Sequence, residues 1–216
     1  MNTIDQREVE RTGAVKRASA MLRSAKVVCQ AGEYVCLVRD VSDEGVLLSY
    51  LHEAPPEPRI ILVLGNGQTH PIQRIWAAEG QASYRFASSV SVAEFLRENA
   101  PFQVRPVRLT IAASARLIDG IESHGARLRD VSTHGACFEC AAIIKPQRLV
   151  SFQIEGLRPQ SGQIVWREED AEGARYGLQF QLPLTLRDLA QTSLKLQPFA
   201  PIALDLGSND ETASAA

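Results

Sequence analysis

Short hydrophobic runs, many of them alternating with polar positions, follow one another along most of the chain. Residues 60–64 and 149–154 are examples, and turn-forming residues such as Gly, Pro, Asn and Asp separate such runs. Short runs bounded in this way are typical of β-strands. Two stretches have helical spacing instead: one starts at Ser91, and the other carries an apolar stripe at Leu186, Leu189, Ala190 and Leu194. The pattern predicts a mainly β protein with two short helices.

The strand pattern repeats after 90 residues. The sequence R-D-V-S-x-x-G occurs at residues 39–45 and again at 129–135, each time between two strand-like runs. Trp76 and Trp166 have the same offset, and each precedes a polar turn, another strand-like run and a helix. A recurrence in one register indicates a duplication. We therefore expect two domains of one fold, each with about six short strands followed by a helix.

Helix-start signals and composition set the expected domain boundaries. Ser91 with Glu94, and Thr185 with Asp188, have the spacing of an N-cap residue and an acidic residue three positions later. The first helix should end before Pro101. The prediction is a polar arm at residues 1–14, a first domain at 15–100, a second domain at 101–197 and a disordered tail at 198–216.

Composition and charge restrict the class of protein. Of the 216 residues, 45% are hydrophobic and 22% charged, as in ordinary globular domains. The net charge of −2 creates no overall field that would attract nucleic acid or an acidic membrane, so an anion site must be local. The sequence lacks an apolar run long enough to span a membrane, and its polar start does not have the pattern of a signal peptide. We expect a cytoplasmic protein with no membrane insertion and no nucleic-acid polymer as partner.

The cysteines and histidines do not form a catalytic or metal-binding pattern. The cysteines lie in strand-like runs, so we expect buried free thiols. Cys137 and Cys140 have C-x-x-C spacing, but on a strand these positions face opposite sides, unlike the tight turn of a zinc site. The four histidines are scattered and are expected at the surface. Phosphate-loop, serine-hydrolase and zinc-protease motifs are missing from the sequence. We expect a protein that is not an enzyme and needs neither metal nor cofactor.

Trp76 and Trp166 allow two interpretations. Each follows a β-branched run that reads as the interior of a domain, so we expect both rings to pack in the core. The alternative is that they are platforms on which the bases of a nucleotide stack.

The repeated motif and its surroundings resemble the PilZ domain, a bacterial receptor for cyclic di-GMP. The family pattern D/N-x-S-x-x-G is matched at Asp40, Ser42 and Gly45 and again at Asp130, Ser132 and Gly135, and the resemblance extends in two units from about residue 15 to 196. It implies an all-β fold with minor α content: two tandem six-stranded antiparallel β-barrels, each followed by a C-terminal helix. It also implies signal transduction that acts on motility, surface polysaccharide or development.

The other mark of the family is an arginine pair, R-x-x-x-R, just before the first strand. Arg108 stands 22 residues before Asp130 and matches the second arginine of the pair. Its partner should lie at Val104, but the chain has Arg105 one position later. In the first copy the position equivalent to Arg108 is occupied by Ala18. By resemblance the ligand-binding residues are Arg105, Arg108, Asp130, Ser132 and Gly135, with a possible weaker second site at Arg17, Asp40, Ser42 and Gly45.

These residue types suit a cyclic dinucleotide. The planar guanidinium of arginine makes paired bonds to a phosphate or to the O6 and N7 atoms of guanine, and its face stacks on a base. An aspartate accepts bonds from the guanine nitrogens, and a serine hydroxyl donates or accepts one bond. The glycine provides either a positive φ or a close backbone approach. The competing interpretation is a plain turn in which Asp and Ser satisfy their own backbone.

The sequence thus predicts a non-enzymatic cyclic di-GMP receptor in second-messenger signalling. The nucleotide would bind mainly to the second domain, and an inter-domain rearrangement about the residues between 99 and 105 would transmit the signal to a protein partner. The alternative is a degenerate adapter that binds a protein partner without nucleotide.

Overall fold

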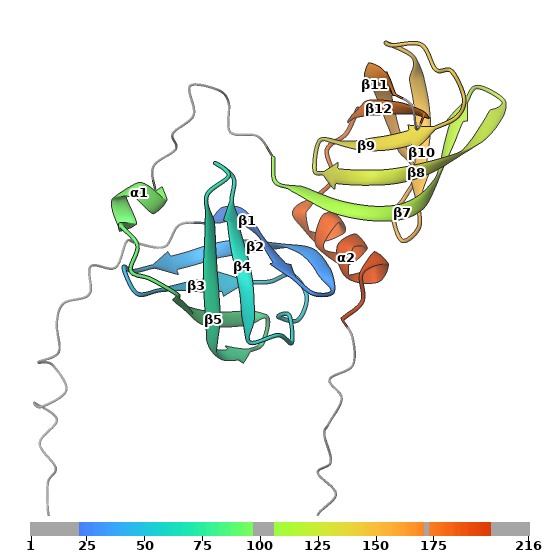
Figure 1. Ribbon diagram of the computed structural model, residues 1–216. Coiled ribbons are helices and arrows are strands. Elements are labelled where there is room, and N and C mark those ends of the chain that lie inside the picture. Colours follow the sequence, from blue (N-terminus) through green and yellow to red (C-terminus); the bar gives the residue numbers. More distant parts are fainter. Residues whose placement is uncertain (1–21, 97–105, 171–172, 200–216) are drawn as a thin grey trace, which may run out of the picture.

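The computed structural model describes residues 22–96, 106–170 and 173–199, which form two β-barrels (Figure 1). The first consists of β1 (Arg23–Cys29), β2 (Gly32–Val41), β3 (Gly45–Ser49), β4 (Arg59–Leu64), β5 (Thr69–Ala78) and β6 (Gln81–Phe86), followed by α1 (Val92–Leu96). The second consists of β7 (Arg108–Asp119), β8 (Glu122–Ser132), β9 (Gly135–Cys140), β10 (Leu149–Ile154), β11 (Gln160–Asp170) and β12 (Gly173–Phe180), followed by α2 (Leu186–Leu196).

Both barrels have the same strand order. The order β1-β2-β3-β6-β5-β4 in the first corresponds to β7-β8-β9-β12-β11-β10 in the second, and both barrels are closed. The pairs that close them, β1 with β4 and β7 with β10, are antiparallel. The predicted fold and the predicted duplication are therefore confirmed. The predicted arm and the predicted hinge lie outside the described residues, as does most of the predicted tail.

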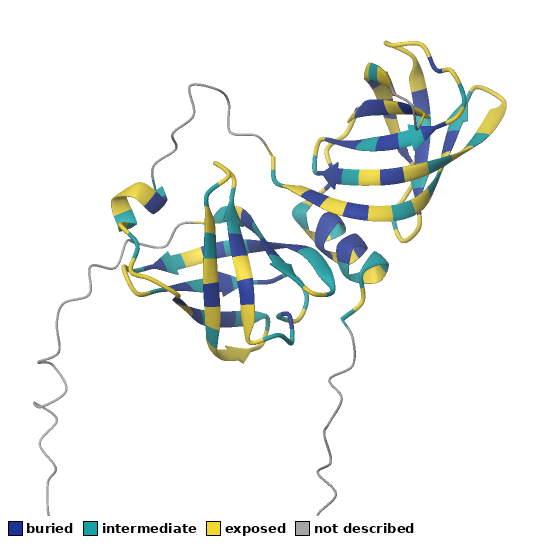
Figure 2. Ribbon diagram, viewed as in Figure 1, coloured by how far each residue is buried: buried dark blue, intermediate teal, exposed yellow. Residues whose placement is uncertain are grey.

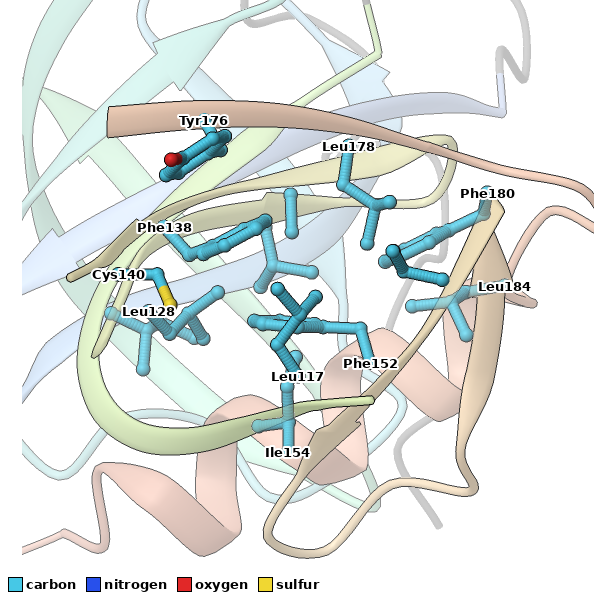
Figure 3. Packing of buried hydrophobic residues seen from close by; sticks show 14 of the residues in the cluster. Leu117, Leu128, Phe138, Cys140, Phe152, Ile154, Tyr176, Leu178, Phe180 and Leu184 are labelled. Atoms are coloured by element: carbon cyan, nitrogen blue, oxygen red, sulfur yellow. The ribbon is translucent and has the colours of Figure 1, made fainter. Parts of the chain in front are cut away.

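Alternation of buried and exposed residues builds the interior of each barrel, and Figure 2 shows it clearly along β7. In the second barrel the ring of Phe138 lies 4.7 Å from that of Phe152 and 5.3 Å from that of Tyr176, measured between centroids (Figure 3). In the first barrel the hydroxyls of Tyr50 and Tyr84 form a hydrogen bond of 2.8 Å. Because side chains fill the barrel interiors, a ligand site has to lie on their outer surfaces.

β-Bulges interrupt the ladders at equivalent places in the two barrels. One precedes the aspartate of each motif, between Val38 and Asp40 and between Leu128 and Asp130. Another precedes each tryptophan and adds Ile75 to β5 and Val165 to β11. A bulge shifts the inside–outside alternation by one residue and turns the following side chain to the other face.

The prediction that both tryptophans pack in the core is wrong. Trp76 and Trp166 are 47% and 39% exposed, and both lie on the outer surface of their barrels. The bulges explain the difference, because a sequence read with an unbroken period of two assigns the residue after each bulge to the wrong face. The alternative interpretation, an exposed aromatic platform, is the one that fits the structure.

Helix α2 belongs to the second barrel but also touches the first. Its start is fixed as predicted: the Thr185 hydroxyl accepts a 3.0 Å bond from the Asp188 N–H, and the Asp188 carboxylate accepts from the Thr185 N–H. Leu189 packs in the core of the second barrel, whereas Leu194 packs against the core of the first. The helix thus lies between the barrels, beside β2 and β7 (Figure 1).

Two expectations about titratable residues hold only in part. All four cysteines are free as predicted, but Cys29 and Cys137 are half-buried rather than buried. The expectation of surface histidines is wrong for His52 and His70. Their rings pack against aromatic neighbours, and burial lowers the pKa of both imidazoles.

Candidate functional site

The motif turn of the second barrel is held by its serine. The hydroxyl of Ser132 donates to the carbonyl of Gly135 at 3.2 Å and accepts from the N–H of His134 at 3.3 Å. Ser132 is buried. In the first barrel the hydroxyl of Ser42 likewise donates to the carbonyl of Gly45, at 3.3 Å, but it accepts from the N–H of Gly45 itself, at 3.1 Å. Both serine hydroxyls thus bond to the backbone of their own turn, as the plain-turn interpretation expects, and hold the loop in shape.

The glycine of the motif is required by a close backbone approach. A Cβ atom at Gly135 would lie 2.2 Å from the carbonyl oxygen of Leu178 on β12, and one at Gly45 would lie 2.5 Å from that of Tyr84. Such distances leave no room for a side chain. The glycine thus lets the motif turn lie directly on the neighbouring strand.

Arg108 and Asp130 form an ion pair beside this turn. The guanidinium Nη1 of Arg108, the first residue of β7, lies 2.5 Å from the Asp130 Oδ1 atom on β8. The two side chains are 53% and 29% exposed. A pair so open to solvent contributes at most about 1 kcal/mol to stability. It can therefore be exchanged for a ligand at little cost.

The pair faces a surface cavity of about 490 Å³. The motif turn and the start of β7 form one part of the cavity lining, and strands β9, β11 and β12 form the other. Its polar and aromatic lining includes Arg108, Asp130, His134, Cys137, Trp166 and Gln179. The cavity therefore combines a cation, a carboxylate and an exposed indole, which are groups that can recognise a phosphate, a base edge and a base face.

Trp166 lies against the backbone of Gly177. A Cβ atom on residue 177 would be 2.0 Å from the indole Nε1 atom, so the ring can take this place only beside a glycine. The interpretation of Trp166 as a core residue missed this part of the site. A signal was present, because a glycine inside a strand often marks the close approach of another group.

Cys137 adds a thiol to the cavity. Burial raises its pKa, and the negative charge of Asp130 raises it further. The thiol therefore stays protonated at neutral pH and acts as a small apolar group.

The second barrel matches a known family. The model of the PilZ domain matches residues 103–195, which include β7 to β12 and most of α2. The second barrel is a PilZ domain. The resemblance noted in the sequence is thereby confirmed, and both barrels have the fold that it implied.

Several solved structures are similar to this chain. Borreliella burgdorferi PlzA in complex with c-di-GMP is 12% identical, with 82% of this chain and 93% of that chain covered and a TM-score of 0.34. The Bacillus subtilis inhibitor of motility MotI/DgrA is 10% identical, with 82% and 97% covered and a TM-score of 0.38. Escherichia coli YcgR in complex with c-di-GMP is 11% identical, with 79% and 81% covered and a TM-score of 0.33. No curated protein sequence matches this chain.

The structure brings together most of the predicted PilZ ligand residues. Arg108, Asp130 and Gly135 line one cavity, and Ser132 holds its turn. Arg105, the other predicted arginine, lies outside the described residues, as does Arg17 of the predicted weaker site.

The first barrel has an equivalent cavity of about 410 Å³, lined by Asp40, Ser42, Gly45 and Trp76. Asp40 accepts a 2.9 Å bond from the N–H of Val41.

The two cavities differ in charge. Glu44 takes the place of His134 in the motif turn, so the first cavity has a second carboxylate. Arg85, which the sequence reasoning did not single out, is the strand partner of Gly45 and lines the first cavity. The equivalent strand partner of Gly135 in the second barrel is the neutral Gln179. The cation of the first cavity, Arg85, thus lies on β6. The cation of the second cavity, Arg108, lies on β7, whose counterpart in the first barrel is β1. The duplicated motif therefore does not give two equal sites.

Within residues 22–96, 106–170 and 173–199, no group of three or more His, Cys, Asp or Glu side chains could hold a metal ion. The helices in these ranges are too short and too polar to cross a membrane.

Proposed function

We propose that this PilZ protein is a non-enzymatic receptor for cyclic di-GMP, which binds in the cavity of the second barrel. The observation that carries the proposal is the Arg108–Asp130 pair in the lining of that cavity. The PilZ match supports it, because the family resemblance implies such a receptor. An arginine and an aspartate side by side can recognise the phosphate and the guanine edge of one nucleotide.

Binding would proceed by exchange of partners. Arg108 would leave Asp130 and bind a phosphate oxygen or the O6 and N7 atoms of a guanine, and the freed carboxylate would accept from guanine nitrogens. The exposed ion pair is worth about 1 kcal/mol or less, whereas a charge-assisted bond to the ligand contributes about 1.5–3 kcal/mol. Trp166 would stack on a base, and Ser132 and Gly135 would hold the turn. Arg105 would supply a second cation.

The first barrel would bind the nucleotide more weakly or not at all. Glu44 stands in its motif turn and would repel the phosphates. Its exposed Ile75 and Trp76 instead form an apolar surface suited to a protein partner.

Strand β7, which carries Arg108, lies beside β2 of the first barrel. We infer that nucleotide binding changes the inter-barrel contact and is transmitted to that partner.

Isothermal titration with cyclic di-GMP tests the proposal. The Arg108→Ala substitution should weaken binding by at least about tenfold, which corresponds to the loss of one charge-assisted bond. Arg148→Ala is the matched control, because Arg148 is 57% exposed and forms a 2.6 Å ion pair with Asp119 on the same barrel. Its affinity should equal that of the unmodified protein. Absence of binding heat at tens of micromolar ligand would favour the adapter alternative instead.

A further inference from the structure

One edge of the strand that carries Arg108 is completed from outside its own barrel. The β7–β10 ladder covers residues 115–118, so among the described residues it leaves the start of β7 without a strand on that side. Unpaired backbone groups at a strand edge need other partners. The carbonyl of Arg108 and both backbone groups of Thr110 find them in side chains of the first barrel and of the segment after α2.

Three side chains, Lys26, Glu33 and Gln197, make these bonds and are called here the edge clamp. The Lys26 ammonium donates to the Arg108 carbonyl at 3.0 Å. The Glu33 Oε2 atom accepts from the Thr110 N–H at 2.7 Å and from Lys26 at 2.6 Å. Gln197 donates to the Thr110 carbonyl at 3.2 Å and accepts from the N–H of Glu33 at 3.1 Å. The clamp thus links β1, β2 and the end of α2 to the first three residues of β7.

The ion pair of the edge clamp is largely buried, although the bonds from the clamp to β7 are exposed. The side chains of Lys26 and Glu33 are 19% and 17% exposed, so their ion pair is less screened than an open surface pair. Gln197 fits because residue 32 is a glycine: a Cβ there would lie 2.4 Å from the Gln197 side chain. The Tyr34 hydroxyl also donates to the Gln197 carbonyl. Charge, hydrogen bonding and packing therefore act on the same few atoms.

We propose that Glu33 and Lys26 are positioning residues for Arg108. They contact neither the cavity nor a ligand, but they fix the backbone of Arg108 and Thr110, and this backbone sets where the Arg108 guanidinium lies. A strand end held by one ladder alone opens easily, and an arginine on such an end binds with a larger entropy cost. The first barrel therefore prepares the site in the second. This inference rests on the proposed function and adds that the first barrel regulates nucleotide binding by the second.

Coupling of this kind is reciprocal. If the edge clamp favours nucleotide binding, the nucleotide must stabilise the clamp by the same factor. The amide proton of Thr110 reports on the clamp because its acceptor is the Glu33 carboxylate. Bound nucleotide should therefore slow hydrogen exchange at Thr110, a position outside the cavity lining.

The test compares Glu33→Ala with Asp119→Ala in the full chain. Asp119 is the matched control: it lies at the other end of β7, its side chain is 19% exposed, and it forms a 2.6 Å ion pair. Glu33→Ala should weaken cyclic di-GMP binding about five- to tenfold, Asp119→Ala should leave it unchanged, and Glu33→Gln, which keeps an acceptor for Thr110, should restore part of the affinity. Thermal melts of the three variants exclude unfolding as the cause.

The outcomes separate the two claims. If the unmodified protein does not bind cyclic di-GMP, the proposed function fails. If it binds and Glu33→Ala has the affinity of Asp119→Ala, the receptor stands and the positioning role is refuted. In the unmodified protein bound nucleotide should slow exchange at Thr110, and in Glu33→Ala this protection should be lost. Equal protection in both proteins would also refute the role of the clamp.

Discussion

The indole of Trp166 lies where a side chain on residue 177 would have to be. A Cβ on Gly177 would stand 2.0 Å from the indole Nε1 atom. In the first barrel the residue that pairs with Trp76 is Ser83, whereas Gly177 pairs with Trp166. The more exposed of the two rings is that of Trp76. The residue opposite the tryptophan therefore helps to decide how closely each ring lies on its barrel.

The Gly177→Ala substitution should push Trp166 away from β12. The added methyl group cannot coexist with the ring, and the ring can move toward solvent. We expect a red-shifted tryptophan emission, measured in a Trp76→Phe background, and cyclic di-GMP binding about tenfold weaker. Unfolding midpoints should change little because the ring is already exposed. An unchanged affinity together with a shifted emission would remove Trp166 from the binding site.

Cys137 should report ligand occupancy. Its thiol lines the cavity and has a raised pKa, so alkylation by iodoacetamide should be slow at pH 7 and should accelerate as the pH increases. Bound cyclic di-GMP should slow this reaction several-fold. Cys29, whose pKa burial raises to about 11, lies in the first barrel and is the internal control. Peptide mass spectrometry after timed alkylation distinguishes the two sites, and equal protection of both would contradict a local effect.

Gly135→Ala should destabilise the second barrel. The new Cβ would lie 2.2 Å from the backbone oxygen of Leu178, which cannot move without disturbing β12. We expect a loss of about 1–3 kcal/mol in the free energy of unfolding, measured by urea denaturation. Gly125→Ala on β8 is the control, because nothing lies within 4 Å of the Cβ position there. Similar losses in the two variants would mean that the close approach is not the cause.

Acidification should destabilise the first barrel through His52. Burial lowers the pKa of this histidine below the ordinary value of 6.5, so the folded state favours the neutral ring. As the pH falls below 6.5, the unfolded chain takes up the proton first, and the free energy of unfolding decreases until the pH reaches the folded-state pKa. Above 6.5 the effect vanishes. Denaturation from pH 7.5 to 5 should show a smaller decrease in His52→Gln.

A control for this pH dependence is His134→Gln, which replaces an exposed histidine. It should keep the pH dependence of the unmodified protein. If His52→Gln loses as much stability on acidification as His134→Gln, another group causes the decrease. His70, whose pKa burial also lowers, would be the next residue to substitute.

The sequence alone determined the architecture of this protein. Strand periodicity, turn residues and helix caps act over a few neighbouring residues, so the twelve strands and the capping box of α2 could be predicted from local patterns. The 90-residue repeat extended this to two copies of one fold. The family resemblance also singled out Arg108 and Asp130, whose side chains form an ion pair in the structure.

Tertiary structure decided the rest, because it depends on atoms far apart in the sequence. The bulges that turn Trp76 and Trp166 outward arise from strand pairing, and a period of two read along the chain cannot reveal them. The close approach that makes Gly135 necessary comes from β12. The bond of Glu33 to Thr110 joins the two barrels, and that of Gln197 ties the end of α2 to β7. Local sequence therefore specified the two barrels, whereas long-range packing specified which side chains line the surface cavities and how the edge of β7 is held.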